Sequence, residues 1–140
     1  APYWRAERGL TFSPAALALA PAERRRVVVE GLLFRVRGIL GDLEHGHGRA
    51  GALERVLVSG GLARDDAVAR GLAAVLGRPV HVVEEPETTL RGAARLAVGS
   101  GRDGLGSKDA PTRRVEPEPG RAWLGAKYAL WREWLARELG

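Results

Sequence analysis

The sequence has 140 residues, 45% of them hydrophobic, which suits one domain with a core and argues against general disorder. The net charge is +5, but the basic residues are spread out and only Arg24–Arg26 form a cluster, so no nucleic-acid partner is expected. No apolar run approaches the about 20 residues of a membrane span, and the N-terminus lacks a signal-peptide pattern. We therefore expect a cytoplasmic protein without a membrane partner.

Four residue types are missing from the sequence: cysteine, methionine, asparagine and glutamine. Cysteine is absent, so the chain offers neither a disulfide framework nor a thiolate metal site. Methionine is absent even at position 1, and we interpret the chain as a piece of a longer polypeptide, although loss of the initiator residue would look the same. Asparagine and glutamine are also absent, which a thermophilic source and a GC-rich genome explain equally well.

The N-terminal third contains one strong helical pattern. Residues 1–20 show no clear period, and we expect extended or loop structure there. Pro21 suits the first turn of a helix, and apolar residues then recur at spacings of three and four from Val29 to Leu43. This pattern predicts an amphipathic helix over residues 22–43.

Short apolar runs alternate with helical patterns in the middle of the chain. Residues 55–59 read as a strand buried on both faces, which ends at Gly60–Gly61. A helix over 65–76, a strand over 80–83 and a helix from 88 to about 98 follow. The order helix-strand-helix-strand-helix predicts an α/β fold with a largely parallel sheet.

The C-terminal part of the chain combines an irregular stretch with one last helical pattern. Residues 99–120 are rich in glycine, proline and charge, and we interpret them as a tether that is exposed or lies over the surface. A last helix over 121–139 contains Trp131 and Trp134, which indicates docking on the same domain. We therefore divide the chain into a domain, residues 1–110, and a tether with a C-terminal docking helix, residues 111–140.

The glycine pair at the end of the first predicted strand is a candidate binding site. Gly60 and Gly61 lack a Cβ, so a ligand could approach the backbone closely. In open α/β sheets ligands bind beyond the carboxyl ends of the strands, where this turn is expected to lie. Taken alone, however, the dipeptide is better explained as a tight turn.

A longer, ordered set of residues changes that interpretation. The set consists of Val58–Arg64, Leu76–Val80, Glu87–Thr89 and Gly92–Ala94. Together these segments resemble the signature of the C-terminal domain of FGGY carbohydrate kinases, members of the actin-like ATPase (ribonuclease H-like) superfamily. A second set resembles the glycerol kinase branch of that family: Ala1–Trp4, Gly9–Thr11, Glu30–Gly31, Phe34, Tyr128 and Trp131.

The resemblance implies an incomplete actin-like domain that forms the ATP-binding part of a polyol or sugar kinase, with ATP and Mg²⁺ as cofactors. In the family the glycine pair, here Gly60 and Gly61, lies against the adenosine, and an Asn beside it contacts the adenine. Asp65 stands at the Asn position. A carboxylate can only accept hydrogen bonds, so the base would be held differently. The alternative is that Asp65 only caps the following helix.

The resemblance also implies what the chain lacks. In the family the catalytic Asp, most sugar contacts and the first phosphate loop belong to the N-terminal domain. We therefore expect no kinase activity from this chain alone, and we expect the missing N-terminal domain or chain as its partner. The alternative function is a stand-alone, non-catalytic nucleotide-binding or interaction module. An incomplete sheet would also expose a strand edge, which favours homo-oligomers.

Other candidate sites are weaker. Arg64, beside the glycine turn, could approach a phosphate, but a solvent-facing arginine is the better explanation. His45 and His47 have no third metal ligand nearby. His81 lies on a predicted strand and is expected to be a hydrogen-bonded core residue. The small residues Gly92–Ala94 should let their helix lie close to the sheet.

Overall fold

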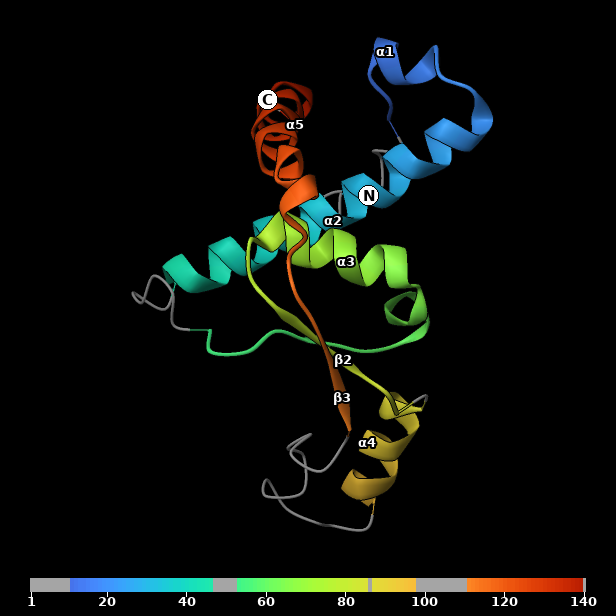
Figure 1. The fold of residues 1–140 in the computed structure, drawn as a ribbon, viewed down its shortest axis with the longest axis vertical. Coiled ribbons are helices and arrows are strands. Elements are labelled where there is room, and N and C mark those ends of the chain that lie inside the picture. The colour runs from blue at the N-terminus through green and yellow to red at the C-terminus, as the bar shows by residue number, and fades with distance from the viewer. Residues whose placement is uncertain (1–10, 47–52, 86, 98–110, 140) are drawn as a thin grey trace.

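The computed structural model describes residues 11–46, 53–85, 87–97 and 111–139 (Figure 1). Its elements in chain order are α1 (Pro14–Leu17), α2 (Pro21–Gly46), β1 (Leu57–Val58), η2 (Gly61–Arg64), α3 (Asp66–Leu76), β2 (Val80–Val83), α4 (Thr88–Ala97), β3 (Thr112–Val115), η5 (Pro119–Arg121) and α5 (Trp123–Leu139). Helices α2, α3 and α5 gather at one end of the strands, and α4 lies at the other (Figure 1). None of the described helices is long and apolar enough to cross a membrane.

The predicted amphipathic helix is confirmed as α2, which extends slightly beyond the predicted bounds. The expectation of extended or loop structure over residues 1–20 is wrong at α1. That short helix starts at Pro14, and the Ser13 hydroxyl accepts a hydrogen bond from the backbone N–H of Ala16 at 3.3 Å. Serine before proline is a normal start signal for a helix. Residues 1–10 lie outside the described part of the chain.

The strands form a three-stranded sheet in the order β1-β2-β3. The predicted parallel pair is confirmed, with Leu57 opposite His81 and Val58 opposite Val82. The prediction of a largely parallel sheet is wrong, because β3 pairs with β2 in the antiparallel direction. The tether interpretation is therefore also wrong for residues 112–115: they form an edge strand and contribute buried Val115 to the core.

Helix α3 forms the centre of the core. Most of its residues from Ala69 to Val75 are buried, and they pack against α2, β2 and β3. At Gly71 the contact with α2 is so close that a Cβ would come within 2.7 Å of Leu33 Cδ1. Val82 is only 4% exposed, whereas Val58 is half-buried at the edge of the core.

The C-terminal end of α3 is fixed by two interactions. Gly77 adopts a left-handed conformation, with φ of +66°, and its N–H donates to carbonyls in the last turn of the helix. This is the usual way in which glycine ends a helix. Arg37 of α2 donates from Nη1 to the Val75 carbonyl at 2.7 Å, so the same helix end is tied to α2.

Helix α5 packs on α2 and α3 through an aromatic cluster. Phe34 lies with its ring centroid 5.8 Å from that of Tyr128 and 5.7 Å from that of Trp131. The Arg37 guanidinium lies 4.3 Å from the Tyr128 ring centroid, and Lys127 pairs with Glu30. Four of the residues that resemble the glycerol kinase branch, Glu30, Phe34, Tyr128 and Trp131, therefore meet at this helix interface, where their role is to hold α5 in place.

Candidate functional site

The glycine turn lies where β1 ends and the chain enters η2 and α3. Gly60 has φ of +94° and ψ of −179°, a conformation that is essentially restricted to glycine. Gly61 has no such backbone requirement. A Cβ added to either residue would meet no atom within 4 Å, so the turn is open on its outer side. The fold therefore explains why position 60 is glycine, but not why position 61 is.

Asp65 lies directly after this turn and starts α3. Its Oδ1 accepts a hydrogen bond from the backbone N–H of Ala67 at 2.8 Å. The alternative interpretation of Asp65 as a helix cap is thereby confirmed. A cap occupies one carboxylate oxygen and does not exclude a second partner for an exposed side chain, so the adenine contact remains a prediction.

Arg64 is the last residue of η2 and is exposed. In the part of the chain that the structure describes, its side chain forms no ion pair or hydrogen bond. It lies in the same short 3₁₀ turn as Gly61, so the turn presents a cation beside an open stretch of backbone. Its role toward a phosphate group remains a prediction.

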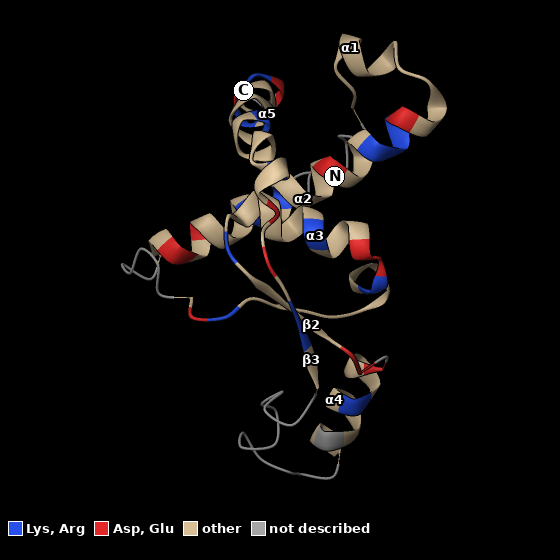
Figure 2. Cartoon of the chain, in the orientation of Figure 1, with Lys and Arg blue, Asp and Glu red and all other residues tan. Residues whose placement is uncertain are grey.

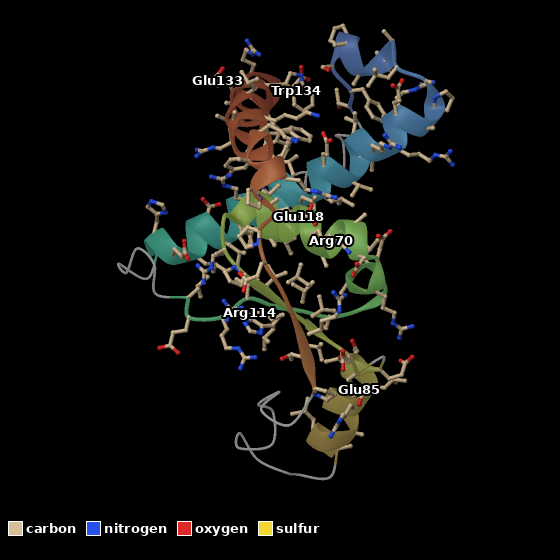
Figure 3. All side chains as sticks on the ribbon, in the orientation of Figure 1. Arg70, Glu85, Arg114, Glu118, Glu133 and Trp134 are labelled. Carbon is tan, nitrogen blue, oxygen red and sulfur yellow. The ribbon has the colours of Figure 1, made fainter. Side chains whose placement is uncertain are left out.

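A network of charges surrounds the start of α3 (Figures 2 and 3). Asp66 contacts Arg70 at 2.7 Å and Arg113 of β3 at 2.9 Å, and Arg70 also contacts Glu118 at 3.2 Å. The hydrogen bond from Arg70, followed by the charge of Arg113, lowers the pKa of Asp66. The hydrogen bond from Asp66 in turn raises the pKa of Arg70.

The sequence pointed to only part of this network. Asp66 and Arg70 stand four residues apart on one helix, a spacing that predicts an ion pair. Arg113 and Glu118 lie in the stretch that we interpreted as a tether, so their contacts could not be foreseen. The network balances the Asp66 carboxylate with two arginines close to the glycine turn.

The structure corrects two of the weaker interpretations. His81 is half-buried, and its side chain makes no hydrogen bond to any described residue, so it is not a satisfied core histidine. Its backbone N–H donates to the Val56 carbonyl, and strand alternation places its side chain on the face opposite Val80 and Val82. The small residues of α4 do not lie against the sheet: Ala93 and Ala94 are exposed, and a Cβ at Gly92 would meet nothing within 4 Å.

Of the two histidines considered as metal ligands, the structure describes only His45 at the end of α2. His45 Nδ1 lies 2.6 Å from the Gly41 carbonyl one turn earlier in the helix. His47 lies outside the described residues. Among those that are described, no three His, Asp or Glu side chains come together as metal ligands.

Comparisons with known proteins agree with the sequence resemblance. Residues 1–100 match the FGGY family of carbohydrate kinases, C-terminal domain. A glycerol kinase of Xanthobacter autotrophicus is 39% identical over 100 residues, which is 69% of this chain and 20% of that protein. A glycerol kinase of Cereibacter sphaeroides is 33% identical over 137 residues, which is 94% of this chain and 27% of that protein.

The solved structures point to the same family. The crystal structure of xylulose kinase from Rhodospirillum rubrum superposes with a TM-score of 0.63 and 26% identity, over 94% of this chain and 26% of that one. Gluconate kinase from Lactobacillus acidophilus superposes with a TM-score of 0.56 and 22% identity, over 84% of this chain and 25% of that one, which supports the fold alone. The chain spans about a quarter of the length of these relatives. It belongs to the FGGY family of carbohydrate kinases and has the α/β fold of the C-terminal, actin-like domain of these enzymes.

Proposed function

We propose that this chain forms the ATP-binding part of a glycerol kinase, which transfers phosphate from ATP to glycerol only together with the remaining part of the enzyme. The observation that carries the proposal is the open glycine turn at the end of β1. Gly61 lacks a side chain although neither its backbone nor its packing requires glycine. Other glycines, Gly120 among them, are equally open, but Gly61 follows the carboxyl end of β1, where ligands bind in open α/β sheets.

The residues around the turn suit an adenine nucleotide. The flat base can rest on the backbone of Gly60 and Gly61, because no Cβ stands between them and solvent. The exposed Asp65 carboxylate can accept from the exocyclic amino group while its Oδ1 caps α3. Arg64 supplies a positive charge for a phosphate group.

Glycerol is proposed as the substrate because both sequence relatives named above are glycerol kinases. The residues that would contact glycerol belong to the remaining part of the enzyme, as does the catalytic base that the family resemblance implies. Mg²⁺ is expected to accompany ATP, but the described residues group no set of ligands for it, so we assign it no position here.

Titration with ATP tests the proposal directly. Gly61→Val should abolish binding, because the new side chain fills the space that the base requires. Gly120→Val is the matched control: Gly120 lies in the other 3₁₀ turn, η5, and a Cβ there also meets nothing within 4 Å. It should bind ATP as the parent does. If the Gly61 variant also binds like the parent, the nucleotide site lies elsewhere.

A kinase assay separates the proposal from the alternative of a non-catalytic module. The chain alone, with ATP, Mg²⁺ and glycerol, should form no glycerol phosphate. Together with the remaining part of a glycerol kinase it should do so, whereas a stand-alone module would bind nucleotide and stay inactive in both cases. Turnover by the chain alone, well above a blank, would refute the proposal.

A further inference from the structure

The start of α3 carries two consecutive carboxylates that differ in their surroundings. Both oxygens of Asp66 are engaged, because Oδ2 lies 2.7 Å from Arg70 Nη2 and Oδ1 lies 2.9 Å from Arg113 Nη2. Asp65 uses only Oδ1, which accepts a hydrogen bond from the backbone N–H of Ala67 at 2.8 Å. Among the residues that the structure describes, Asp65 Oδ2 has no hydrogen-bond or ion-pair partner. This exposed residue can therefore accept a further hydrogen bond beside the glycine turn.

The cap also fixes the position of the Asp65 carboxylate. The backbone of this residue is extended, with φ of −75° and ψ of 114°, as is usual at the start of a helix. Because Oδ1 is held by the Ala67 N–H, rotation of the side chain is restricted. A ligand that binds the carboxylate therefore meets an acceptor whose orientation is already set, which lowers the entropic cost of binding.

Leu62 lies on the same side of the turn as Asp65. The N–H of Asp65 donates to the Leu62 carbonyl at 3.2 Å, the hydrogen bond that closes a 3₁₀ turn. Side chains three residues apart in such a turn lie one above the other. Leu62 is 65% exposed although it is a large aliphatic residue. The turn thus presents an apolar side chain and a carboxylate next to the open backbone of Gly60 and Gly61.

The chemistry of a carboxylate determines which purine it pairs with best. An ionised carboxylate accepts hydrogen bonds but cannot donate them, and Oδ1 of Asp65 keeps a second lone pair while it caps α3. Adenine offers one donor, its exocyclic amino group, and places an acceptor ring nitrogen beside it. Guanine offers two neighbouring donors, a ring N–H and its exocyclic amino group. A carboxylate can therefore form two parallel hydrogen bonds with guanine, as it does with an arginine, but only one with adenine.

We propose that Asp65 selects the base at the glycine turn and that this site binds guanine nucleotides more tightly than adenine nucleotides. The inference rests on the proposed function, since it concerns the base of the nucleotide that lies on Gly60 and Gly61. One face of the base rests on the glycine backbone beside the Leu62 side chain, and the edge of the base meets the Asp65 carboxylate. ATP remains a ligand of the same turn, held by one hydrogen bond fewer.

The charges around the turn act on both nucleotides alike. GTP and ATP carry the same phosphates, so the Arg64 cation attracts both and the Asp65 charge repels both to the same extent. Asp66, one residue further along, already has both oxygens engaged by arginines. A difference between the GTP and ATP affinities therefore reports on hydrogen bonds to the base rather than on net charge.

Titration calorimetry of the 140-residue chain with GTP, ATP and ITP tests the proposal. GTP should bind at least about fivefold more tightly than ATP, which is the lower end of the discrimination that a bidentate pair gives between bases. ITP keeps the ring N–H of guanine but lacks its amino group. It should therefore bind less tightly than GTP.

The Asp65→Asn variant should change the two affinities in opposite directions. The amide keeps the cap and gives adenine a donor, but it leaves guanine with a single acceptor, so the preference for GTP should disappear. Asp66→Asn is the matched control: it removes the same charge one residue away and should leave the ratio of the GTP and ATP affinities unchanged. Circular dichroism at the temperature of the titration checks that both variants are folded.

Two results would overturn the proposal. One is binding of ATP by the parent chain as tightly as GTP or more tightly, and the other is a GTP preference that Asp65→Asn leaves unchanged. If ATP binds and Gly61→Val abolishes that binding, either result refutes base selection by Asp65 and leaves the proposed function standing. If neither nucleotide binds, the proposed function fails and the inference fails with it.

Discussion

Asp65 Oδ1 accepts a hydrogen bond from the backbone N–H of Ala67 at 2.8 Å, directly beside the glycine turn. One carboxylate thus caps α3 and lies next to the proposed adenine site. An N-terminal cap of this kind stabilises a helix by about 1 kcal/mol. The structural role of Asp65 is therefore established, and its role toward a ligand can be measured separately.

The Asp65→Asn variant should bind ATP more tightly than the parent. An amide keeps the cap, because Asn and Asp cap helices about equally well. It can also donate to a ring nitrogen, which a carboxylate cannot, and satisfying that buried acceptor is worth about 1–3 kcal/mol. The gain should be smaller for inosine nucleotides, which lack the amino group. Equal ATP affinities for the two proteins would show that Asp65 is a cap and nothing more.

Asp66 should make the stability of the chain sensitive to acid. Its pKa is lowered from 3.8 in the folded state, so its contribution is fully present above about pH 4 and is lost as the pH falls through the lower, folded-state value. Asp66→Asn should therefore lower the melting temperature at pH 7, and the difference from the parent should disappear in strong acid.

High salt should reduce the same difference, because Asp66 and its partners are exposed. Asp42→Asn is the control, since Asp42 is an exposed carboxylate on α2 that makes no ion pair with a described residue. A stability loss at Asp66 that persists unchanged in strong acid would show that the ion pairs do not cause it.

Gly71→Ala should destabilise the protein although alanine is the better helix former. The added Cβ would lie 2.7 Å from Leu33 Cδ1, and Leu33 is itself buried. Overpacking of this kind costs about 1–3 kcal/mol, against roughly 1 kcal/mol gained in helix propensity. Gly31→Ala, on α2 with nothing within 4 Å, should instead be stabilising. Urea unfolding of both variants gives the comparison, and equal stabilisation would mean that α2 and α3 are packed less closely.

Val82→Ala should cost more than Val58→Ala, although the two residues are partners in the parallel ladder. Val82 is 4% exposed at the centre of the sheet, and Val58 is half-buried on the edge strand. We expect about 2 kcal/mol for Val82→Ala and roughly half of that for Val58→Ala, in proportion to the methyl groups removed from the core. Unfolding by denaturant measures both losses of stability. If they are equal, the Val58 side chain is as buried in solution as that of Val82.

Local sequence signals were sufficient for most of the elements. Pro21 with the spacing of apolar residues predicted α2, and Gly77 predicted the end of α3. Each of these signals acts within one or two helical turns, so it can be read without knowledge of the rest of the chain. The glycine turn and the cap at Asp65 could be placed for the same reason.

Tertiary structure alone decided the features that depend on distant residues. The β3 sequence Thr-Arg-Arg-Val is too polar to predict a strand, and it becomes one because β2 supplies its hydrogen-bond partners. The contact of Arg113 with Asp66 follows from that pairing, across 47 positions of sequence. The exposure of Leu32, Val36, Ile39 and Leu43 on α2 is likewise invisible in the sequence, where they are interspersed with residues of the same helix that are buried. Periodicity shows which residues share a face, but only packing determines which face is covered.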